Sequence, residues 1–178
     1  MRRANDFYPT PGAATAILLN NAKHLFSDVA HAYEPCVGDG AIARVLKNAG
    51  LVVTTNDIDT SRRADSHLDA AKMEIMPFES CVITNPPFNQ ALPIVRNFVE
   101  QGVRCAFLLR LSFLEPTEAR GGWLAENPPD RLIILPRISF TGDGKTDSVT
   151  CAWMIWNTPD EQGIIVVIKQ EMAKFDFI

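Results

Sequence analysis

The most informative stretch of the chain for its fold is Cys81-Val82-Ile83-Thr84-Asn85-Pro86-Pro87-Phe88. Its first half is an apolar run of strand length, which predicts a buried strand. Proline has no backbone N–H to continue a sheet ladder, so the strand ends where the two prolines begin. The stretch therefore predicts a loop at a sheet edge, where α/β proteins place their ligand sites.

Strand-like and helix-like segments alternate on both sides of this stretch. Apolar spacing predicts a helix that opens at Pro11, with Thr10 as its N-cap, and ends near Ser27. The other predicted helices are 41–48, which Gly50 closes, and 91–101. The predicted strands are 29–33, 51–56, 81–84, 103–109, 132–135 and 150–156. Residues 57–79 show no clear pattern, and the apolar run 164–168 predicts either an edge strand or a packed tail.

The alternation predicts an α/β fold with a mainly parallel sheet. The strands 132–135 and 150–156 are expected to pair late in the chain as an antiparallel hairpin. A chain of 178 residues fits one domain, 1–178, without a separate target recognition domain. No apolar run has the length of a membrane span, and no secretory signal follows Met1-Arg2-Arg3. We expect no membrane association and a cytoplasmic location.

Charge and cysteine content narrow the functional classes further. The net charge of −4 argues against a protein that coats nucleic acid by charge alone, so a nucleic-acid function has to rest on a specific site. The cysteines are widely spaced singles in or beside apolar runs, which predicts buried free thiols and no metal site. They are Cys36, Cys81, Cys105 and Cys151.

The loop Asn85-Pro86-Pro87-Phe88 carries a recognisable chemistry. The Asn85 side-chain oxygen and the Pro86 carbonyl are hydrogen-bond acceptors, and Phe88 is a flat stacking surface. This combination suits a planar amine. The structural alternative is that the loop only ends the strand and that Phe88 fills a core pocket.

A second candidate site lies after the first predicted strand. The loop Glu34-Pro35-Cys36-Val37-Gly38-Asp39-Gly40 precedes a helix, and its glycines allow a ligand to approach the backbone closely. Asp57 ends the next strand about 20 residues later, where a carboxylate can accept both hydroxyls of a ribose. A tight structural turn remains the alternative for the glycines.

These motifs together resemble the class I methyltransferases that use S-adenosylmethionine. The segment Phe7-Tyr8-Pro9-Thr10-Pro11, which precedes the glycine loop, resembles the methionine-binding segment of the gamma-ordered adenine-N6 DNA methyltransferases. Weaker similarity to the small phage and prophage enzymes runs through 107–110 and 139–144, and the resemblance extends to about Trp156. It implies a single Rossmann-like class I methyltransferase domain and S-adenosyl-L-methionine as cofactor, with S-adenosyl-L-homocysteine as product.

The resemblance also implies roles for individual residues. Asn85, Pro86, Pro87 and Phe88 form the catalytic motif. The implied cofactor contacts are Tyr8 and Thr10 at the methionine end, Glu34, Gly38 and Gly40 at the methionine amine and backbone, Asp57 at the ribose, Ile58 at the adenine, and Asp69 at the exocyclic amine. For the last contact Asp69 is preferred over Asp65.

The implied acceptor is adenine in DNA, either single-stranded or flipped out of a duplex so that Phe88 can stack on it. Arg110, Arg137 and Lys145 are candidate phosphate contacts, and Phe140 is a candidate contact to nucleic acid. Without a recognition domain, we expect a short or weak sequence specificity, read by residues 114–122 and 137–149. The expected setting is the cytoplasm of a bacterial or phage-infected cell.

Three alternatives stay open. Loops of the N-P-P-aromatic type also occur in enzymes that methylate adenine in RNA or glutamine in protein. A non-catalytic module that keeps the fold and binds nucleic acid is the third, although its motifs are expected to be damaged and here they are present.

Overall fold

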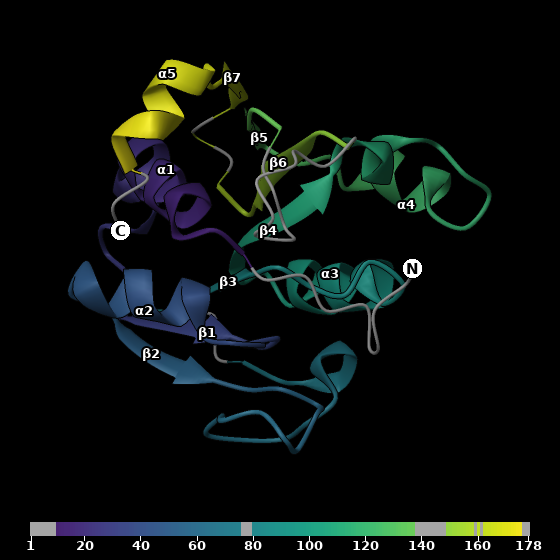
Figure 1. Ribbon diagram of the computed structural model, residues 1–178. Coiled ribbons are helices and arrows are strands. Elements are labelled where there is room, and N and C mark those ends of the chain that lie inside the picture. The colour runs from purple at the N-terminus through teal and green to yellow at the C-terminus, as the bar shows by residue number, and fades with distance from the viewer. Residues whose placement is uncertain (1–9, 76–79, 138–148, 159, 161, 176–178) are drawn as a thin grey trace.

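The computed structural model describes residues 10–75, 80–137, 149–158, 160 and 162–175. Its centre is a seven-stranded sheet in the order β2-β1-β3-β4-β6-β5-β7 (Figure 1). The strands are β1 His31–Glu34, β2 Val52–Thr55, β3 Ser80–Thr84, β4 Arg104–Arg110, β5 Arg131–Ile134, β6 Cys151–Trp156 and β7 Gly163–Val166. Strand β6 pairs antiparallel with β4 and β5, and every other pairing is parallel. The predicted mainly parallel α/β fold with a late antiparallel hairpin is confirmed.

Helices cover both faces of the sheet. The α-helices are α1 Gly12–Ala22, α2 Ala41–Asn48, α3 Ala91–Glu100, α4 Gly121–Glu126 and α5 Lys169–Met172, and the short 3-10 helices are η2 Lys23–Phe26, η3 Ala70–Lys72, η4 Leu111–Leu114 and η5 Ala173–Phe175. Side chains of α1, α2 and α5 pack in one core, and those of α3 and α4 pack in the other. No helix within these described ranges is long and apolar enough to cross a membrane.

Strand β4 shows why the central strands read as continuous apolar runs. Cys105, Phe107 and Leu109 point into the core beneath α3, while Ala106 and Leu108 point into the core beneath α1 and α2. A strand covered on both faces has no solvent side and needs no polar residue at every second position. The interior of β4 is therefore wholly buried.

The two tryptophans of β6 lie in opposite cores, as the period of two along a strand predicts. Both are almost fully buried. Trp153 Nε1 donates to the Ala14 carbonyl at 2.8 Å, and Trp156 Nε1 donates to the Asn127 carbonyl at 3.0 Å. Both tryptophans therefore serve core packing.

The beginning of the chain differs from the prediction in two places. Pro11, and not Thr10, is the N-cap of α1, because the helix begins at Gly12. The Thr10 hydroxyl oxygen accepts a hydrogen bond from Asn85 Nδ2 at 3.0 Å. The first strand begins at His31, and not at Val29, because the Val29 amide bonds back to the Phe26 carbonyl and closes the turn after η2. The predicted helix 41–48 coincides with α2.

The end of the chain resolves the alternative for residues 164–168. Residues 163–166 form β7, an edge strand parallel to β5. Ile164 and Val166 are exposed, and Ile165 packs against the core. Helices η4 and α4 were not predicted, and they occupy part of the 114–122 connection. Most of the 137–149 turn lies outside the described residues.

The cysteines are free thiols, as predicted. Cys81, Cys105 and Cys151 are buried, whereas Cys36 is half-buried. Burial raises the pKa of the Cys81 thiol to about 12, so this side chain stays neutral and acts as a small apolar group. In the portion of the chain that the structure describes, no three His, Cys, Asp or Glu side chains come together in an arrangement that could hold a metal ion.

Candidate active site

A cavity of about 390 Å³ lies beyond the carboxyl ends of β1 and β3. The connection from β1 to β2 runs through α2 on one face of the sheet, and that from β3 to β4 runs through α3 on the other. Neighbouring strands whose connections leave in opposite directions open a crevice between their ends, and ligands of α/β proteins bind there. The volume falls within the range of about 300–1,000 Å³ that is usual for small-molecule sites.

Most residues that the sequence analysis selected line this cavity. They are Thr10, Glu34, Gly38, Asp57, Ile58, Asp69, Asn85, Pro86, Pro87 and Phe88. Gly40 is the N-cap of α2 and does not line the cavity. Tyr8 lies outside the described residues. The fold therefore brings together segments that are separated by more than seventy positions, such as those of Thr10 and Asn85.

The glycine loop turns sharply at the mouth of α2. Gly38 and Gly40 have φ angles of 55° and 75°, which side chains with a Cβ rarely adopt. The Gly40 amide donates to the Val37 carbonyl at 2.8 Å, and the Val37 amide donates to the Asn56 carbonyl at 2.9 Å. These bonds tie the loop to the end of β2, so the loop backbone forms a fixed wall of the cavity.

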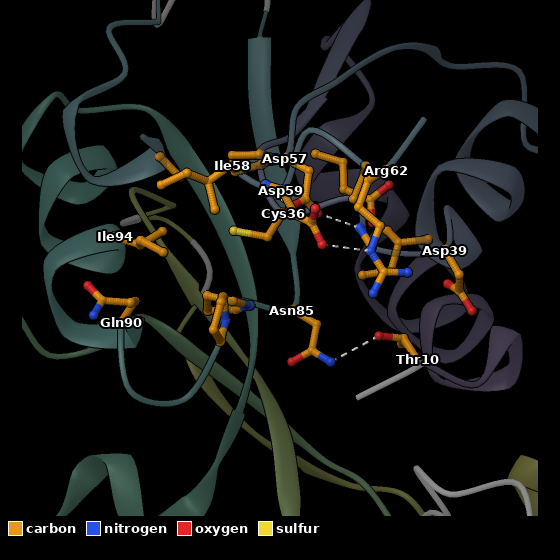
Figure 2. A pocket seen from close by; sticks show the side chains of 18 of the residues that line it. Thr10, Cys36, Asp39, Asp57, Ile58, Asp59, Arg62, Asn85, Gln90 and Ile94 are labelled. Carbon is orange, nitrogen blue, oxygen red and sulfur yellow. Dashed lines mark hydrogen bonds and ion pairs between the residues drawn. The ribbon is translucent and has the colours of Figure 1, made fainter. Parts of the chain in front are cut away.

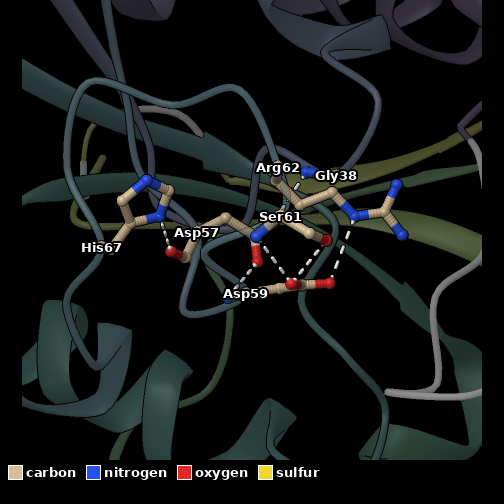
Figure 3. Close-up of polar contacts among 6 residues, drawn as sticks. All are labelled: Gly38, Asp57, Asp59, Ser61, Arg62 and His67. Atoms are coloured by element: carbon tan, nitrogen blue, oxygen red, sulfur yellow. Dashed lines mark hydrogen bonds and ion pairs between the residues drawn. The ribbon is translucent and has the colours of Figure 1, made fainter.

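Asp57 is held at this wall by two backbone amides. Its Oδ2 accepts from the Gly38 amide and its Oδ1 accepts from the Asp59 amide, both at 2.9 Å (Figure 3). His67 Nδ1 lies 2.9 Å from the Asp57 carbonyl. Each carboxylate oxygen has a second lone pair and can accept a further hydrogen bond. Asp57 is thus a rigid acceptor that borders the cavity.

Arg62 also lines the cavity and was missed by the sequence analysis. Its Nε lies 3.5 Å from Asp59 Oδ2, and Asp59 Oδ1 in turn accepts from the amide and hydroxyl of Ser61 (Figure 3). Residues 57–79 have no periodicity, so no local signal predicts which of their side chains turn toward the glycine loop. Gln90 and Ile94 also line the cavity without a sequence signal, and Cys36 of the glycine loop lines it too (Figure 2).

Asp65 and Asp69 have different surroundings. Asp65 Oδ2 accepts from the Thr55 amide and hydroxyl, both at 2.8 Å, and these bonds lower the pKa of Asp65. Asp65 does not border the cavity. Asp69 does border it, while its Oδ1 accepts from the Ala71 amide at 3.1 Å. The placement suits the preference for Asp69, whose role as a cofactor contact stays a prediction.

Glu34 is a buried carboxyl group at the floor of the cavity. It is 2% exposed, and its Oε2 has no hydrogen-bond partner among the described residues. Burial raises the pKa of Glu34 well above its usual range, although the Ala43 backbone N–H acts to lower it. The charges of Asp39 and Asp57 raise it further. A cationic group that enters the cavity can reverse this penalty.

We expect Glu34→Gln to stabilise the protein without ligand at pH 7 and to have little effect below pH 4.5, the ordinary pKa of a glutamate. A carboxyl group whose pKa is raised by folding contributes stability below its unfolded pKa and loses it as the pH rises through the folded pKa. Glutamine has no such loss. Denaturant unfolding at both pH values measures the difference, with the exposed Glu118→Gln as control. An equal difference at both pH values would contradict the prediction.

The catalytic motif follows β3 directly. Asn85 Nδ2 donates to Thr10 Oγ1 at 3.0 Å, and Figure 2 shows the Asn85 side-chain oxygen on the side away from Thr10. The Gln90 amide donates to the Pro87 carbonyl at 2.9 Å and closes the turn that leads into α3. Pro86 is buried, and Phe88 is half-buried at the cavity. The alternative in which Phe88 serves only as core filling does not match this position.

Of the predicted nucleic-acid contacts that the structure describes, Arg110 lies beside the motif. Its guanidinium carbon sits 4.0 Å from the centre of the Phe88 ring. Arg137 is exposed and does not line the cavity. Phe140 and Lys145 lie outside the described residues.

The comparisons with known proteins concern the fold. No protein-family model and no curated protein matches the chain. Among solved structures, it is similar to the crystal structure of a protein from Pyrococcus horikoshii that is provisionally assigned as an RNA methyltransferase. The TM-score is 0.62 at 17% sequence identity, and the similarity covers 84% of this chain and 86% of the other. The chain thus shares its α/β fold with that protein over most of both lengths.

Proposed function

We propose that this protein transfers a methyl group from S-adenosylmethionine to the N6 amine of adenine in DNA, with short or weak sequence specificity. The observation that carries the proposal is the position of Asn85-Pro86-Pro87-Phe88. This motif and the glycine loop border the same cavity, and the Asn85 amide is oriented by Thr10. The likeness in fold to a protein assigned as a methyltransferase supports the same class of reaction.

The polar and apolar groups that line the cavity match those of the cofactor. The Glu34 Oε2 atom has no partner among described residues and suits the cofactor's ammonium group. Asp57 suits the ribose hydroxyls, because its carboxylate is fixed by backbone amides and has lone pairs left. Ile58, which is 67% exposed at the cavity, is an apolar surface for the adenine, and Asp69 is an acceptor for its amine. Thr10 and the backbone at Gly38 and Gly40 are the other predicted contacts within the described residues, and Tyr8 lies outside them.

The bound cofactor supplies an electrophilic methyl group on a positively charged sulfur and leaves as the neutral S-adenosylhomocysteine. The protein has to prepare the amine, whose lone pair is delocalised into the adenine ring. We propose that the Asn85 side-chain oxygen and the Pro86 carbonyl accept hydrogen bonds from its two N–H groups. These bonds favour a tetrahedral nitrogen and stabilise the positive charge that develops on it.

Positioning completes the proposed mechanism. The two prolines restrict the loop, so both acceptors are held before the substrate arrives. Phe88 offers a ring face on which the flipped or single-stranded base can stack. No strong base is required, because the amine becomes acidic once methylated and its proton can pass to solvent.

Adenine in RNA is the second candidate acceptor. It is favoured by one specific observation, the assignment of the structural neighbour as an RNA methyltransferase. Protein glutamine is the less favoured alternative, because the aromatic position holds Phe88, whereas the glutamine-directed relatives usually have tyrosine there. The intact motif and glycine loop count against a non-catalytic module.

The product of the reaction tests the proposal. Purified protein is incubated with labelled S-adenosylmethionine and, in separate reactions, with unmethylated DNA, RNA of the same sequence and a glutamine-containing peptide. Mass spectrometry of the digests then identifies the methylated unit. We expect N6-methyldeoxyadenosine from DNA and little product from the peptide.

Each other outcome has a definite meaning. N6-methyladenosine from RNA alone would transfer the proposal to the second candidate. Methylated glutamine would overturn the nucleobase proposal. Cofactor binding without product on any acceptor would contradict the proposed reaction and favour the non-catalytic module.

A further inference from the structure

The contact between Arg110 and Phe88 is not explained by cofactor binding. The Arg110 guanidinium carbon lies 4.0 Å from the Phe88 ring centre, which is a face-on cation–π distance. Phe88 lines the cavity, whereas Arg110 does not. Phe88 therefore borders the cavity while the Arg110 guanidinium lies over its ring.

Strand pairing places this arginine beside the motif. Thr84 at the end of β3 is level with Phe107 of β4, and β4 continues for three more residues to Arg110. That end of β4 is supported from its other side, where Arg110 pairs with Cys151 of β6. The Arg110 backbone is thus part of the sheet. Its side chain reaches the motif from a rigid element.

Charge distinguishes Arg110 from several other arginines. Arg96, Arg104 and Arg120 each lie within ion-pair distance of a carboxylate. No carboxylate among the described residues lies within such a distance of the Arg110 guanidinium. A half-buried guanidinium that lies on an aromatic ring keeps its in-plane N–H donors for another partner. The partner that matches this geometry and charge is a phosphate, bound by two parallel hydrogen bonds.

We propose that Arg110 binds a backbone phosphate of the target strand while it remains stacked on Phe88. The target base then stacks on the ring region that borders the cavity, so one aromatic ring links recognition of the base to recognition of its backbone. The pair selects an acceptor within a phosphodiester chain over a free nucleoside or a glutamine side chain. This inference rests on the proposed function for the identity of the base, but the phosphate contact can be tested separately.

Binding is the first test. Fluorescence anisotropy measures the affinity for a labelled single-stranded, adenine-containing oligonucleotide in the presence of S-adenosylhomocysteine. We expect Arg110→Gln to weaken binding about tenfold or more and to reduce the slope of log K against log salt by about 0.7, the loss of one phosphate contact on a single strand. Arg110→Lys keeps the charge but not the flat stacking group, so its affinity for the oligonucleotide should fall between that of the parent and that of Arg110→Gln.

The matched control is Lys47→Gln, which removes one positive charge from an exposed site near the end of α2. It should bind the oligonucleotide like the parent. Binding of S-adenosylhomocysteine, measured by calorimetry, shows for each variant that the cavity is intact. An unchanged affinity in Arg110→Gln, an equal loss in Lys47→Gln, or a parent protein that binds no oligonucleotide would each overturn the phosphate contact.

Methyl transfer is the second test, with the oligonucleotide and with free deoxyadenosine as acceptors. We expect Arg110→Gln to raise KM for the oligonucleotide by a clearly larger factor than KM for deoxyadenosine, because only the oligonucleotide has the phosphate. An equal loss on both acceptors would mean that Arg110 only supports the Phe88 ring. If the parent forms no product but Arg110→Gln still weakens oligonucleotide binding selectively, the proposed reaction fails and the phosphate contact stands.

Discussion

Replacement of Asn85 by alanine is expected to lower kcat by about 10²–10³-fold, which corresponds to about 2.7–4 kcal/mol of transition-state stabilisation. The change removes an acceptor that acts on the amine as charge develops. It also removes the hydrogen bond from Asn85 Nδ2 to Thr10 Oγ1. Affinity for the cofactor should stay near that of the parent, because the glycine loop and Asp57 are untouched. Single-turnover methylation assays measure the rate of methyl transfer, and calorimetry measures the affinity for the cofactor.

Asn89→Ala is the matched control for this prediction. Asn89 is an exposed asparagine in the same loop and does not line the cavity. Its replacement should leave kcat unchanged. Asn85→Asp keeps an acceptor oxygen, and the Thr10 hydroxyl can donate to that carboxylate, so we expect activity between parent and Asn85→Ala. A parent-like kcat in Asn85→Ala would remove the motif from the mechanism.

Replacement of Asp57 by alanine is expected to weaken cofactor binding by about 100-fold or more. Hydrogen bonds to a charged acceptor contribute about 1.5–3 kcal/mol each, and the two ribose hydroxyls would lose theirs. The change also leaves the amides of Gly38 and Asp59 without their carboxylate acceptor. The glycine loop would then no longer be held in the shape that the cavity needs. Titration calorimetry with S-adenosylhomocysteine measures the loss.

Asp65→Ala provides the comparison for Asp57→Ala. Asp65 also holds a loop through its carboxylate, but it does so at Thr55 and outside the cavity. We expect a lower melting temperature with cofactor affinity close to that of the parent. If both variants lose cofactor affinity to the same extent, the effect of Asp57 comes from loop stability and not from contact with the ribose.

Much of the fold could be predicted from local pattern. The run 81–84 and the two prolines that follow it mark the end of β3, and the helix 41–48 is bounded by glycines on both sides. The alternation of segments predicts the mainly parallel sheet. These features depend on residues that are close together in the chain, so a short stretch of sequence is enough to predict them.

Errors occurred where a distant partner competes with a local signal. Thr10 is a residue type that is common at N-caps, but α1 begins one residue later than predicted, and the Thr10 hydroxyl oxygen accepts from Asn85, seventy-five positions away. Arg62 lies in a segment without periodicity, and only the folded loop turns it toward the glycine loop.

The sequence by itself therefore determined the class of fold, the two strand-end motifs and the residue types that suit a methyl-transfer site. Tertiary structure decided which of these residues meet. It placed Asp69 at the cavity and Asp65 outside it, left Glu34 Oε2 buried and without a partner among described residues, and laid Arg110 on the Phe88 ring. The physical reason is that burial and stacking depend on the register of β1, β3 and β4, and long-range strand pairing has no signal within a short stretch of chain.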